Sequence, residues 1–208
     1  MSQPQAVIFD IGNVLIEWNP EAYFDRLMSV EARERMFAET AIVEMNTEID
    51  RGAAFRQTVF DLAELHPAWS HMIRRWHDDW LAILTPEIAP CSRILRALRS
   101  RGVPVFALSN FGGDNFDVAL RHYPVLAEFD RAYISGRMGV VKPDPQIYQR
   151  VEADCGLPAG SLLFVDDRAD NIAAAAARGW RTHLFEGWQG WARRVVAEGL
   201  LSESEAGL

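Results

Sequence analysis

The sequence predicts an α/β protein: a Rossmann-like, doubly wound parallel sheet with a helical cap inserted after the first strand. In the C-terminal part of the chain, short apolar runs alternate with helix-like segments, as in parallel sheets with helices on both faces. Between about residues 20 and 84, apolar residues instead recur at three- and four-residue spacings, which indicates several helices and no strands. The length of 208 residues fits one domain with a sizeable insertion or two small domains.

The first predicted strand covers residues 6–9 and is followed by Asp10. A short apolar run bounded by chain-breaking residues is typical of a buried strand. Gly12 and Asn13 interrupt the run, and apolar residues return at 14–16. A carboxylate therefore stands at the tip of the first strand, where the chain turns sharply.

The segments after the insertion alternate regularly between helices and strands. A helical face with Ile94, Leu95 and Leu98 stops at Gly102, because glycine favours the end of a helix. The remaining predicted elements are strands at 103–108, 162–165 and 180–185 and helices at 145–155 and 171–178.

This pattern divides the chain into two predicted units. Residues 1–17 and 86–208 are expected to form the α/β core, and residues 18–85 the helical cap. Open parallel sheets bind their ligands in a crevice outside the carboxyl ends of the strands. An insertion directly after the first strand could therefore lie over that crevice as a lid.

Composition and charge restrict the classes of partner. The formal net charge of −8 and the pI of about 5.1 argue against nucleic acid held by a broad basic surface. No apolar stretch approaches the roughly 20 residues of a membrane-spanning helix, and the N-terminus lacks the pattern of a signal peptide. We expect a cytoplasmic protein, monomer or homodimer, that acts on a small molecule without nucleic acid or membrane.

Polar residues follow three separate strands of the predicted sheet: Asp10, the pair Ser109–Asn110 and the pair Asp166–Asp167. The carboxyl ends of parallel strands lie at one edge, so these side chains could meet in one crevice. A carboxylate can act as a covalent nucleophile in phosphoryl transfer when a divalent cation neutralises the approaching charges. These residue types therefore fit phosphate chemistry.

The same residues offer ligands for a metal and for a phosphoryl group. Magnesium prefers oxygen ligands and keeps several waters, so Asp10, Asp167 and the backbone carbonyl of Gly12 would be enough to bind it. Donors at Ser109 and Asn110, with an ammonium at Lys142, would complete a shell around the phosphoryl oxygens.

Three neighbouring residues are further candidates. Trp18 follows the nucleophile loop and could face the crevice, and Asn13 in that loop is a second candidate for substrate contact. Asn171 is equally compatible with an orienting hydrogen bond to its loop and with a place at the start of the next helix.

Four motifs of the sequence resemble those of the haloacid dehalogenase-like (HAD) hydrolase superfamily. They are FDIGNVL at 9–15, ALSN at 107–110, VKPDPQIY at 141–148 and FVDDRADN at 164–171. The resemblance covers almost the whole chain, with residues near 18–85 in the place of the family's helical cap. It implies these roles: nucleophile, Asp10; phosphoryl binding, Ser109 and Lys142; magnesium binding, Asp167 with Asp166 and Asn171 in support.

Within the superfamily, the chain looks most like bacterial phosphatases of the glucose-1-phosphate phosphatase type, and the segment NTEIDRG at 46–52 looks like their cap. Most members of the superfamily carry a second aspartate, a general acid and base, where this chain has Gly12. Such help is typically worth about 10²–10⁴ in rate, so its loss would slow a phosphatase without abolishing it. Water, a cap residue or a leaving group of lowered pKa could stand in for it.

The expected function is magnesium-dependent hydrolysis of a small, sugar phosphate-like metabolite through an aspartyl-phosphate at Asp10. The first alternative is a 2-haloacid dehalogenase that needs no metal, since that branch also lacks the second aspartate; the retained Asp166–Asp167 pair argues for metal and phosphate. The second alternative is a catalytically weak phosphate-binding or regulatory protein. The cap sets specificity, and its residues carry no pattern that identifies the substrate.

Overall fold

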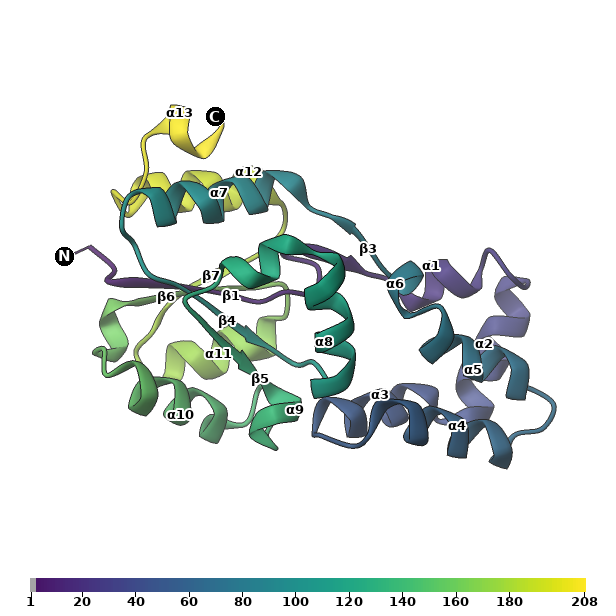
Figure 1. Cartoon of the computed structure of the whole chain (residues 1–208). Helices are drawn as coiled ribbons and strands as arrows, with labels where there is room; N and C mark the ends of the chain where they lie inside the picture. Colours follow the sequence, from purple (N-terminus) through teal and green to yellow (C-terminus); the bar gives the residue numbers. More distant parts are fainter. Residues whose placement is uncertain (1–2) are drawn as a thin grey trace.

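A computed structural model describes residues 3–208 and contains a five-stranded sheet in which all neighbouring strands are parallel (Figure 1). The strand order is β5-β4-β1-β6-β7. The strands are β1 (Ala6–Phe9), β4 (Val105–Ser109), β5 (Arg131–Ile134), β6 (Leu162–Asp166) and β7 (Arg181–Leu184). Helices flank this sheet, and the predicted α/β, Rossmann-like fold is confirmed.

β1 lies in the middle of the sheet, although it comes first in the sequence. Val7 pairs with Val105 of β4 on one side and with Leu163 of β6 on the other. All four residues of β1 are fully buried, as is usual for a parallel sheet with helices on both faces. This burial explains the uninterrupted apolar run, and it brings Asp10 to the carboxyl edge of the sheet.

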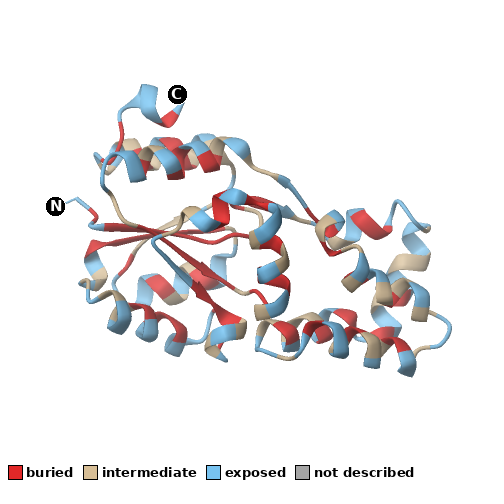
Figure 2. Cartoon of the chain, viewed as in Figure 1, coloured by how far each residue is buried: buried red, intermediate tan, exposed pale blue. Residues whose placement is uncertain are grey.

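The core helices form a layer on each face of the sheet (Figure 1). They are α7 (Ala89–Ser100), α8 (Gly113–His122), α9 (Ser135–Met138), α10 (Pro145–Cys155), α11 (Ala169–Ala177), α12 (Trp188–Ala197) and α13 (Glu203–Ala206), with short 3₁₀ turns at Pro124–Glu128 and Ala159–Ser161. Val7 and Phe9 of β1 pack in one apolar cluster with α7, α8 and α12. Ala6 and Ile8 pack in the other with α10 and α11. Figure 2 shows these buried residues on the strands and on the helix surfaces that face them.

A helical segment occupies residues 20–83. Its helices are α1 (Pro20–Phe24), α2 (Val30–Thr40), α3 (Ile42–Asp50), α4 (Phe55–Leu65), α5 (Ser70–Asp78) and α6 (Trp80–Ile83). β2 (Ile16–Trp18) leads into this segment, β3 (Leu84–Glu87) leads out, and the two strands pair antiparallel. Both connections to the core therefore lie side by side, and the far end of the segment returns to the core where α3 contacts α9 (Figure 1).

Five core elements have no counterpart in the sequence prediction: β5, α8, α9, α12 and α13. β5 has four residues, begins with an arginine and is half exposed at the edge of the sheet, so it lacks a continuous apolar run. α8 begins at a pair of glycines, which are poor helix formers. The core elements that were predicted with bounds agree with the observed ones to within two residues at each end. For example, β4 begins at Val105 because the N–H of Val103 still bonds to the Leu98 carbonyl at the end of α7.

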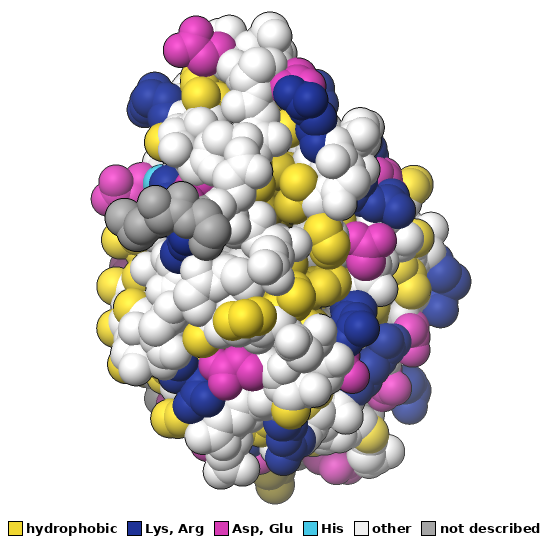
Figure 3. All heavy atoms as spheres, turned by 90° about the vertical axis from the view of Figure 1, so that its left-hand side faces the viewer, with side chains coloured by type: hydrophobic (Ala, Val, Ile, Leu, Met, Phe, Trp, Pro, Cys, Tyr) yellow, Lys and Arg dark blue, Asp and Glu magenta, His cyan; other side chains and the backbone are white. Residues whose placement is uncertain are grey.

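The surface mixes charges of both signs. Figure 3 shows the face at the amino ends of the strands, where acidic and basic side chains surround a band of apolar side chains. Within residues 3–208, no helix combines the length and the apolar character needed to cross a bilayer.

Candidate active site

Asp10 lies at the carboxyl end of β1, and only 6% of the residue is exposed. Its Oδ1 atom accepts hydrogen bonds from the backbone N–H of Ile11 (2.7 Å) and from Oγ of Ser109 (2.6 Å), and it lies 3.0 Å from Nζ of Lys142. Within the described residues, Oδ2 has no hydrogen-bond partner. One oxygen thus fixes the carboxylate, and the other remains available for bond formation or for a cation.

Lys142 is the single lysine of the sequence, and it is buried between two carboxylates. Its Nζ atom lies 3.0 Å from Asp10 Oδ1 and 2.6 Å from Asp166 Oδ2, and it donates a hydrogen bond to the Leu108 carbonyl (2.9 Å). Burial lowers the pKa of this ammonium, but the two carboxylates outweigh burial and hold the pKa above its usual value. Lys142 is therefore a fixed positive charge next to Asp10.

The two consecutive aspartates after β6 have different surroundings. Both oxygens of Asp166 accept hydrogen bonds from Asn171 Nδ2 (3.0 Å each), and Oδ1 also accepts one from the backbone N–H of Arg168 (2.8 Å). Asp166 is fully buried and holds Lys142 in place. Asp167 is half-buried, and its Oδ2 atom accepts a hydrogen bond from Asn13 Nδ2 (3.0 Å).

The donor set suits a hard divalent cation. Oxygens of Asp10, Asp166 and Asp167 lie within 4.8 Å of one another, and Lys142 is the one ammonium that faces this group. Burial raises the pKa of Asp10 to about 7, against the opposing effect of Lys142, and burial also raises the pKa of Asp167. One ammonium therefore balances only part of the negative charge of these three carboxylates. A cation with oxygen ligands would supply the missing positive charge.

The remaining predicted residues lie around this group. The carboxamide of Asn110 pairs with the backbone of Lys142, accepting from its N–H (2.7 Å) and donating to its carbonyl (2.9 Å). Asn13 adopts a left-handed conformation (φ 56°) and accepts a hydrogen bond from the N–H of Trp18 (2.9 Å). Gly12 lies between these segments, and the atom nearest to a side chain built there would be Cβ of Trp18, at 3.7 Å. The structure thus brings the predicted residues into one region without assigning their roles.

The ring of Trp18 packs into the aromatic cluster of the helical segment. It lies 4.8 Å from the ring of Trp80 and 5.7 Å from that of Trp76, measured between centroids. Trp80 also contacts Phe111, two residues after Ser109. Trp18 therefore joins the loop after Asp10 to the helical segment, and the residue remains half-buried.

Asp50, the last residue of α3, is a carboxyl group near this site that sequence analysis missed. Burial raises its pKa to about 7; the N–H of Gly112 and the charge of Lys142 act in the opposite direction, whereas the charge of Asp10 raises it further. Asp50 belongs to the segment NTEIDRG, so its position was visible in the sequence. Its contact with the core was not, because that depends on how the helical segment packs on Ser135 and its neighbours.

The end of α3 docks closely on the core (Figure 1). Gly52 has a φ of +113°, and a Cβ atom there would lie 2.8 Å from the carbonyl oxygen of Gly136. Ser135 donates a hydrogen bond from Oγ to the Asp50 carbonyl (2.6 Å). Oγ of Ser135 also accepts a hydrogen bond from the N–H of Phe111 (2.9 Å). This contact fixes Asp50 against the loop that follows Ser109.

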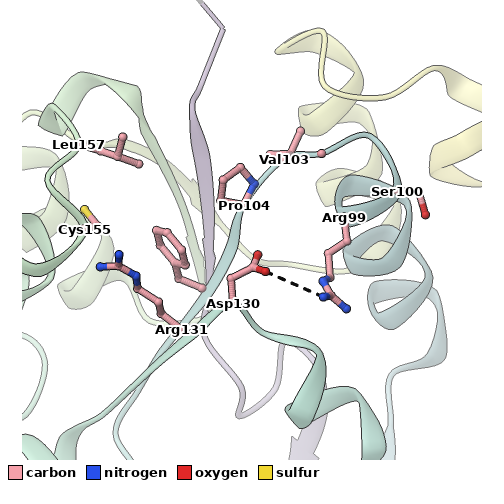
Figure 4. A pocket seen from close by; sticks show the side chains of 10 residues that line it. Arg99, Ser100, Val103, Pro104, Asp130, Arg131, Cys155 and Leu157 are labelled. Atoms are coloured by element: carbon pink, nitrogen blue, oxygen red, sulfur yellow. Dashed lines mark ion pairs between the residues drawn. The ribbon is translucent and has the colours of Figure 1, made fainter.

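An open pocket of about 640 Å³ lies at the amino ends of the strands, opposite the candidate site (Figure 4). Its lining includes Val103 and Pro104 before β4 and Asp130 and Arg131 at the start of β5. These are the amino ends of the strands, and the pocket contains none of the site residues described above. Its charged side chains form ion pairs at the surface, such as Arg99 with Asp130 at 3.9 Å.

Comparison with known families agrees with this site. Residues 4–179 match the model of the haloacid dehalogenase-like hydrolase family. The chain belongs to this family. It is therefore a HAD hydrolase, and the family assignment made from the four motifs is confirmed; the glucose-1-phosphate phosphatase subgroup is not part of this result.

Curated relatives of this HAD hydrolase have more than one activity. It is 26% identical to drimenol cyclase drtB of Aspergillus calidoustus over 87% of this chain but spans only 34% of that protein. It is 25% identical to sesquiterpene phosphatase astK of Aspergillus oryzae over 84% of this chain and 86% of that one. It is 29% identical to the (S)-2-haloacid dehalogenase of Pseudomonas sp. strain YL over 58% of each chain.

Solved structures share the fold over nearly the whole chain. A HAD family enzyme of Bacteroides thetaiotaomicron matches with a TM-score of 0.73 and 19% identity, covering 93% of this chain and 98% of that one. A HAD-like hydrolase of Porphyromonas gingivalis matches with a TM-score of 0.70 and 25% identity, covering 94% and 98%. These likenesses extend over the helical segment as well as the sheet.

Proposed function

We propose that this HAD hydrolase is a magnesium-dependent phosphatase that cleaves a small phosphorylated metabolite through an aspartyl-phosphate at Asp10. The observation that carries the proposal is the pairing of a buried nucleophile with a fixed ammonium: Asp10 is held by Ser109 and Lys142, with further carboxylates within 4.8 Å. The dehalogenase branch needs no metal and typically lacks the metal carboxylates, whereas this chain retains the Asp166–Asp167 pair.

In this proposal Asp10, Asp167 and the carbonyl of Gly12 hold magnesium, which would neutralise charge between the nucleophile and the phosphoryl group. In the same proposal, Lys142 and the hydroxyl of Ser109 bind the phosphoryl oxygens. Asp166 and Asn171 keep Lys142 in position through the contacts described above.

The chain's own groups supply the covalent steps. An oxygen of Asp10 attacks phosphorus, and the bond from phosphorus to the leaving oxygen breaks. Water then attacks the phosphorus of the aspartyl-phosphate and returns Asp10 and inorganic phosphate. Asn110 keeps the Lys142 backbone fixed during both steps, and its amide retains one N–H for a phosphoryl oxygen.

The substrate side of the proposal rests on the helical segment. We propose that residues 18–85 act as a cap over the core formed by 1–17 and 86–208, and that Asn13 and Trp18 contact the substrate from the connection between them. The likeness of NTEIDRG to caps of the glucose-1-phosphate phosphatase type supports a sugar phosphate-like substrate. We further propose that the protein acts in the cytoplasm. The match to sesquiterpene phosphatase astK covers 86% of that protein, and it supports phosphate ester hydrolysis as the reaction class.

The test is phosphate release from a panel of phosphomonoesters, including glucose 1-phosphate and 4-nitrophenyl phosphate, with magnesium and with EDTA. We expect release that requires magnesium and is lost in Asp10→Asn. Halide release from 2-chloropropionate in EDTA would instead establish the dehalogenase, which the 29% identical relative favours. If magnesium and phosphate bind but no substrate turns over, the chain is a binding or regulatory protein and the proposal fails.

A further inference from the structure

Gly12 supplies no acid where most HAD hydrolases carry one, so the leaving group needs another proton donor. We propose that Asp50, brought to the site by the docked end of α3, is the general acid and base of the reaction. This inference rests on the phosphatase function proposed above and assigns one more catalytic residue to it.

Both the main chain and the side chain of Asp50 are fixed. Ser135 Oγ donates to its carbonyl oxygen at 2.6 Å, which ties it to the core. Asn46, one turn earlier in α3, donates from Nδ2 to Asp50 Oδ2 at 3.1 Å, and Trp76 Nε1 in turn donates to Asn46 Oδ1 at 3.2 Å. The carboxyl group is thus oriented from inside the helical segment while its backbone is held by the core.

The charges that act on Asp50 are those of the reaction centre. Among the titratable groups of residues 3–208, Asp10 and Lys142 are the ones whose charges act on its pKa. Burial is the larger effect and places this pKa at about 7, although the residue is not fully enclosed. A carboxyl group with a pKa near neutral pH can both donate and accept a proton, and partial exposure lets it exchange protons with water.

The other carboxylates of the site have different tasks. Asp10 is the proposed nucleophile, and both oxygens of Asp166 are occupied by hydrogen bonds in a fully buried position. Asp167 is held by Asn13 and belongs to the proposed metal site. Asp50 is a further carboxyl group whose pKa responds to the charge of Asp10.

The proton balance of the two steps closes on Asp50. When the oxygen of Asp10 attacks phosphorus, the leaving oxygen keeps the electron pair of its broken bond and takes the proton of the Asp50 carboxyl group. The Asp50 carboxylate then removes a proton from water as the water oxygen bonds to phosphorus. That second step frees Asp10 as a carboxylate, releases phosphate and leaves Asp50 protonated for the next cycle.

The leaving group provides the decisive experiment. An alkyl phosphate such as glycerol 1-phosphate needs a proton on its leaving oxygen, whereas 4-nitrophenyl phosphate releases a weakly basic phenolate. With magnesium present, Asp50→Asn should lose about 10²–10⁴ in kcat on the alkyl ester but less than about 10 on the aryl ester. Glu48→Gln is the matched control: this exposed residue of the same helix pairs with Arg51 (2.5 Å) and should change neither rate.

The pH profile gives a second, independent readout. For wild type on the alkyl ester, kcat/KM should fall as the pH rises above about 7, because Asp50 then loses the proton that it must donate. In Asp50→Asn this alkaline decline should be absent. An identical decline in the variant would assign it to another group and overturn the proposal.

A rescue experiment separates proton transfer from structural support. A Cβ atom at Gly12 would meet its nearest atom at 3.7 Å, an ordinary contact, so the backbone leaves room for the start of a side chain and Gly12→Asp is a suitable test. In the Asp50→Asn background, Gly12→Asp should recover at least about tenfold of the lost kcat on the alkyl ester, within the typical size of acid–base help. If Asp50 only held the helical segment in place, an acid at Gly12 would restore nothing.

The outcomes distinguish this inference from the function on which it rests. If 4-nitrophenyl phosphate is hydrolysed in an Asp10-dependent way but Asp50→Asn slows both esters equally, the phosphatase assignment stands and the role of Asp50 is wrong. If neither ester is hydrolysed by wild type under any condition, both proposals fail together.

Discussion

The core side and the helical side of the candidate site hold their charged groups in different ways. On the core side, Asp10, Lys142 and Asp166 are buried and bonded to one another at 2.6–3.0 Å. On the helical side, Asp50 is a single, partly exposed carboxyl group that accepts a hydrogen bond from Asn46. In the proposed phosphatase, the core side would bind the phosphoryl group that all phosphomonoesters share, and the helical segment would contact the part that varies between them.

The largest effect should come from removing the central charge of the core side. Lys142→Met leaves two buried carboxylates without their partner, which typically costs about 3–5 kcal/mol of unfolding free energy. Activity should also fall by about 10²–10³ or more, because a donor to the transferring oxygens is lost. Urea unfolding at pH 8 without metal and phosphate release measure the two effects.

Arg168→Gln is the control for this experiment. Its guanidinium is exposed and pairs with Asp170 at 2.8 Å in the loop after β6, so its loss should change stability by less than about 1 kcal/mol. Equal unfolding midpoints for Lys142→Met and wild type would contradict the picture of a preorganised core side.

The helical side should reveal itself through pH. The pKa of Asp50 is about 7 in the folded protein and about 3.9 in an unfolded chain, so the folded protein keeps a proton that the unfolded chain gives up. This contribution is fully present below about pH 4 and is lost as the pH rises to about 7. The difference in unfolding free energy between Asp50→Asn and wild type should therefore shift in favour of the variant between pH 5 and pH 8. The expected shift is about 2–4 kcal/mol. Urea unfolding without metal at the two pH values measures this, and a gain of the same size at both would contradict it.

A smaller effect is expected where the two sides meet. Gly52→Ala combines a strained φ of +113° with a Cβ 2.8 Å from the Gly136 carbonyl oxygen, so the end of α3 must move away from the core. Gly102→Ala has a similar backbone conformation (φ +75°) and no atom within 4 Å. Both should lose about 1–2 kcal/mol in thermal unfolding for the left-handed conformation, but Gly52→Ala alone should lose activity. Equal activity of the two variants would mean that docking of α3 is not required.

The smallest effect should come from the pocket at the amino ends of the strands (Figure 4). Arg99 and Asp130 are exposed and 3.9 Å apart, so Arg99→Ala should change stability by less than about 0.5 kcal/mol and leave phosphate release unchanged. A clear loss of activity in this variant would link the pocket to catalysis and weaken the assignment of the site to one edge of the sheet.

The sequence was most informative where local pattern determines structure. β1 and β6 are buried on both faces, so their apolar runs and the polar residues after them were visible, and the topology of a parallel sheet then brings Asp10 and Asp166 together. β5 was missed because an edge strand of four residues, half of them exposed, has no such pattern. Asp50 was missed because its burial comes from the contact of α3 with Ser135 and Gly136, two residues more than 80 positions away.

The burial of Lys142 has a practical consequence for spectroscopy. Because it is the single lysine of these 208 residues, labelling with isotopically enriched lysine would give one side-chain ammonium signal, and this signal would originate between Asp10 and Asp166. The same scarcity leaves amine-reactive dyes without a surface lysine to modify. The chain thus carries a built-in NMR reporter that would sense a ligand or cation at the proposed reaction centre without any engineered probe.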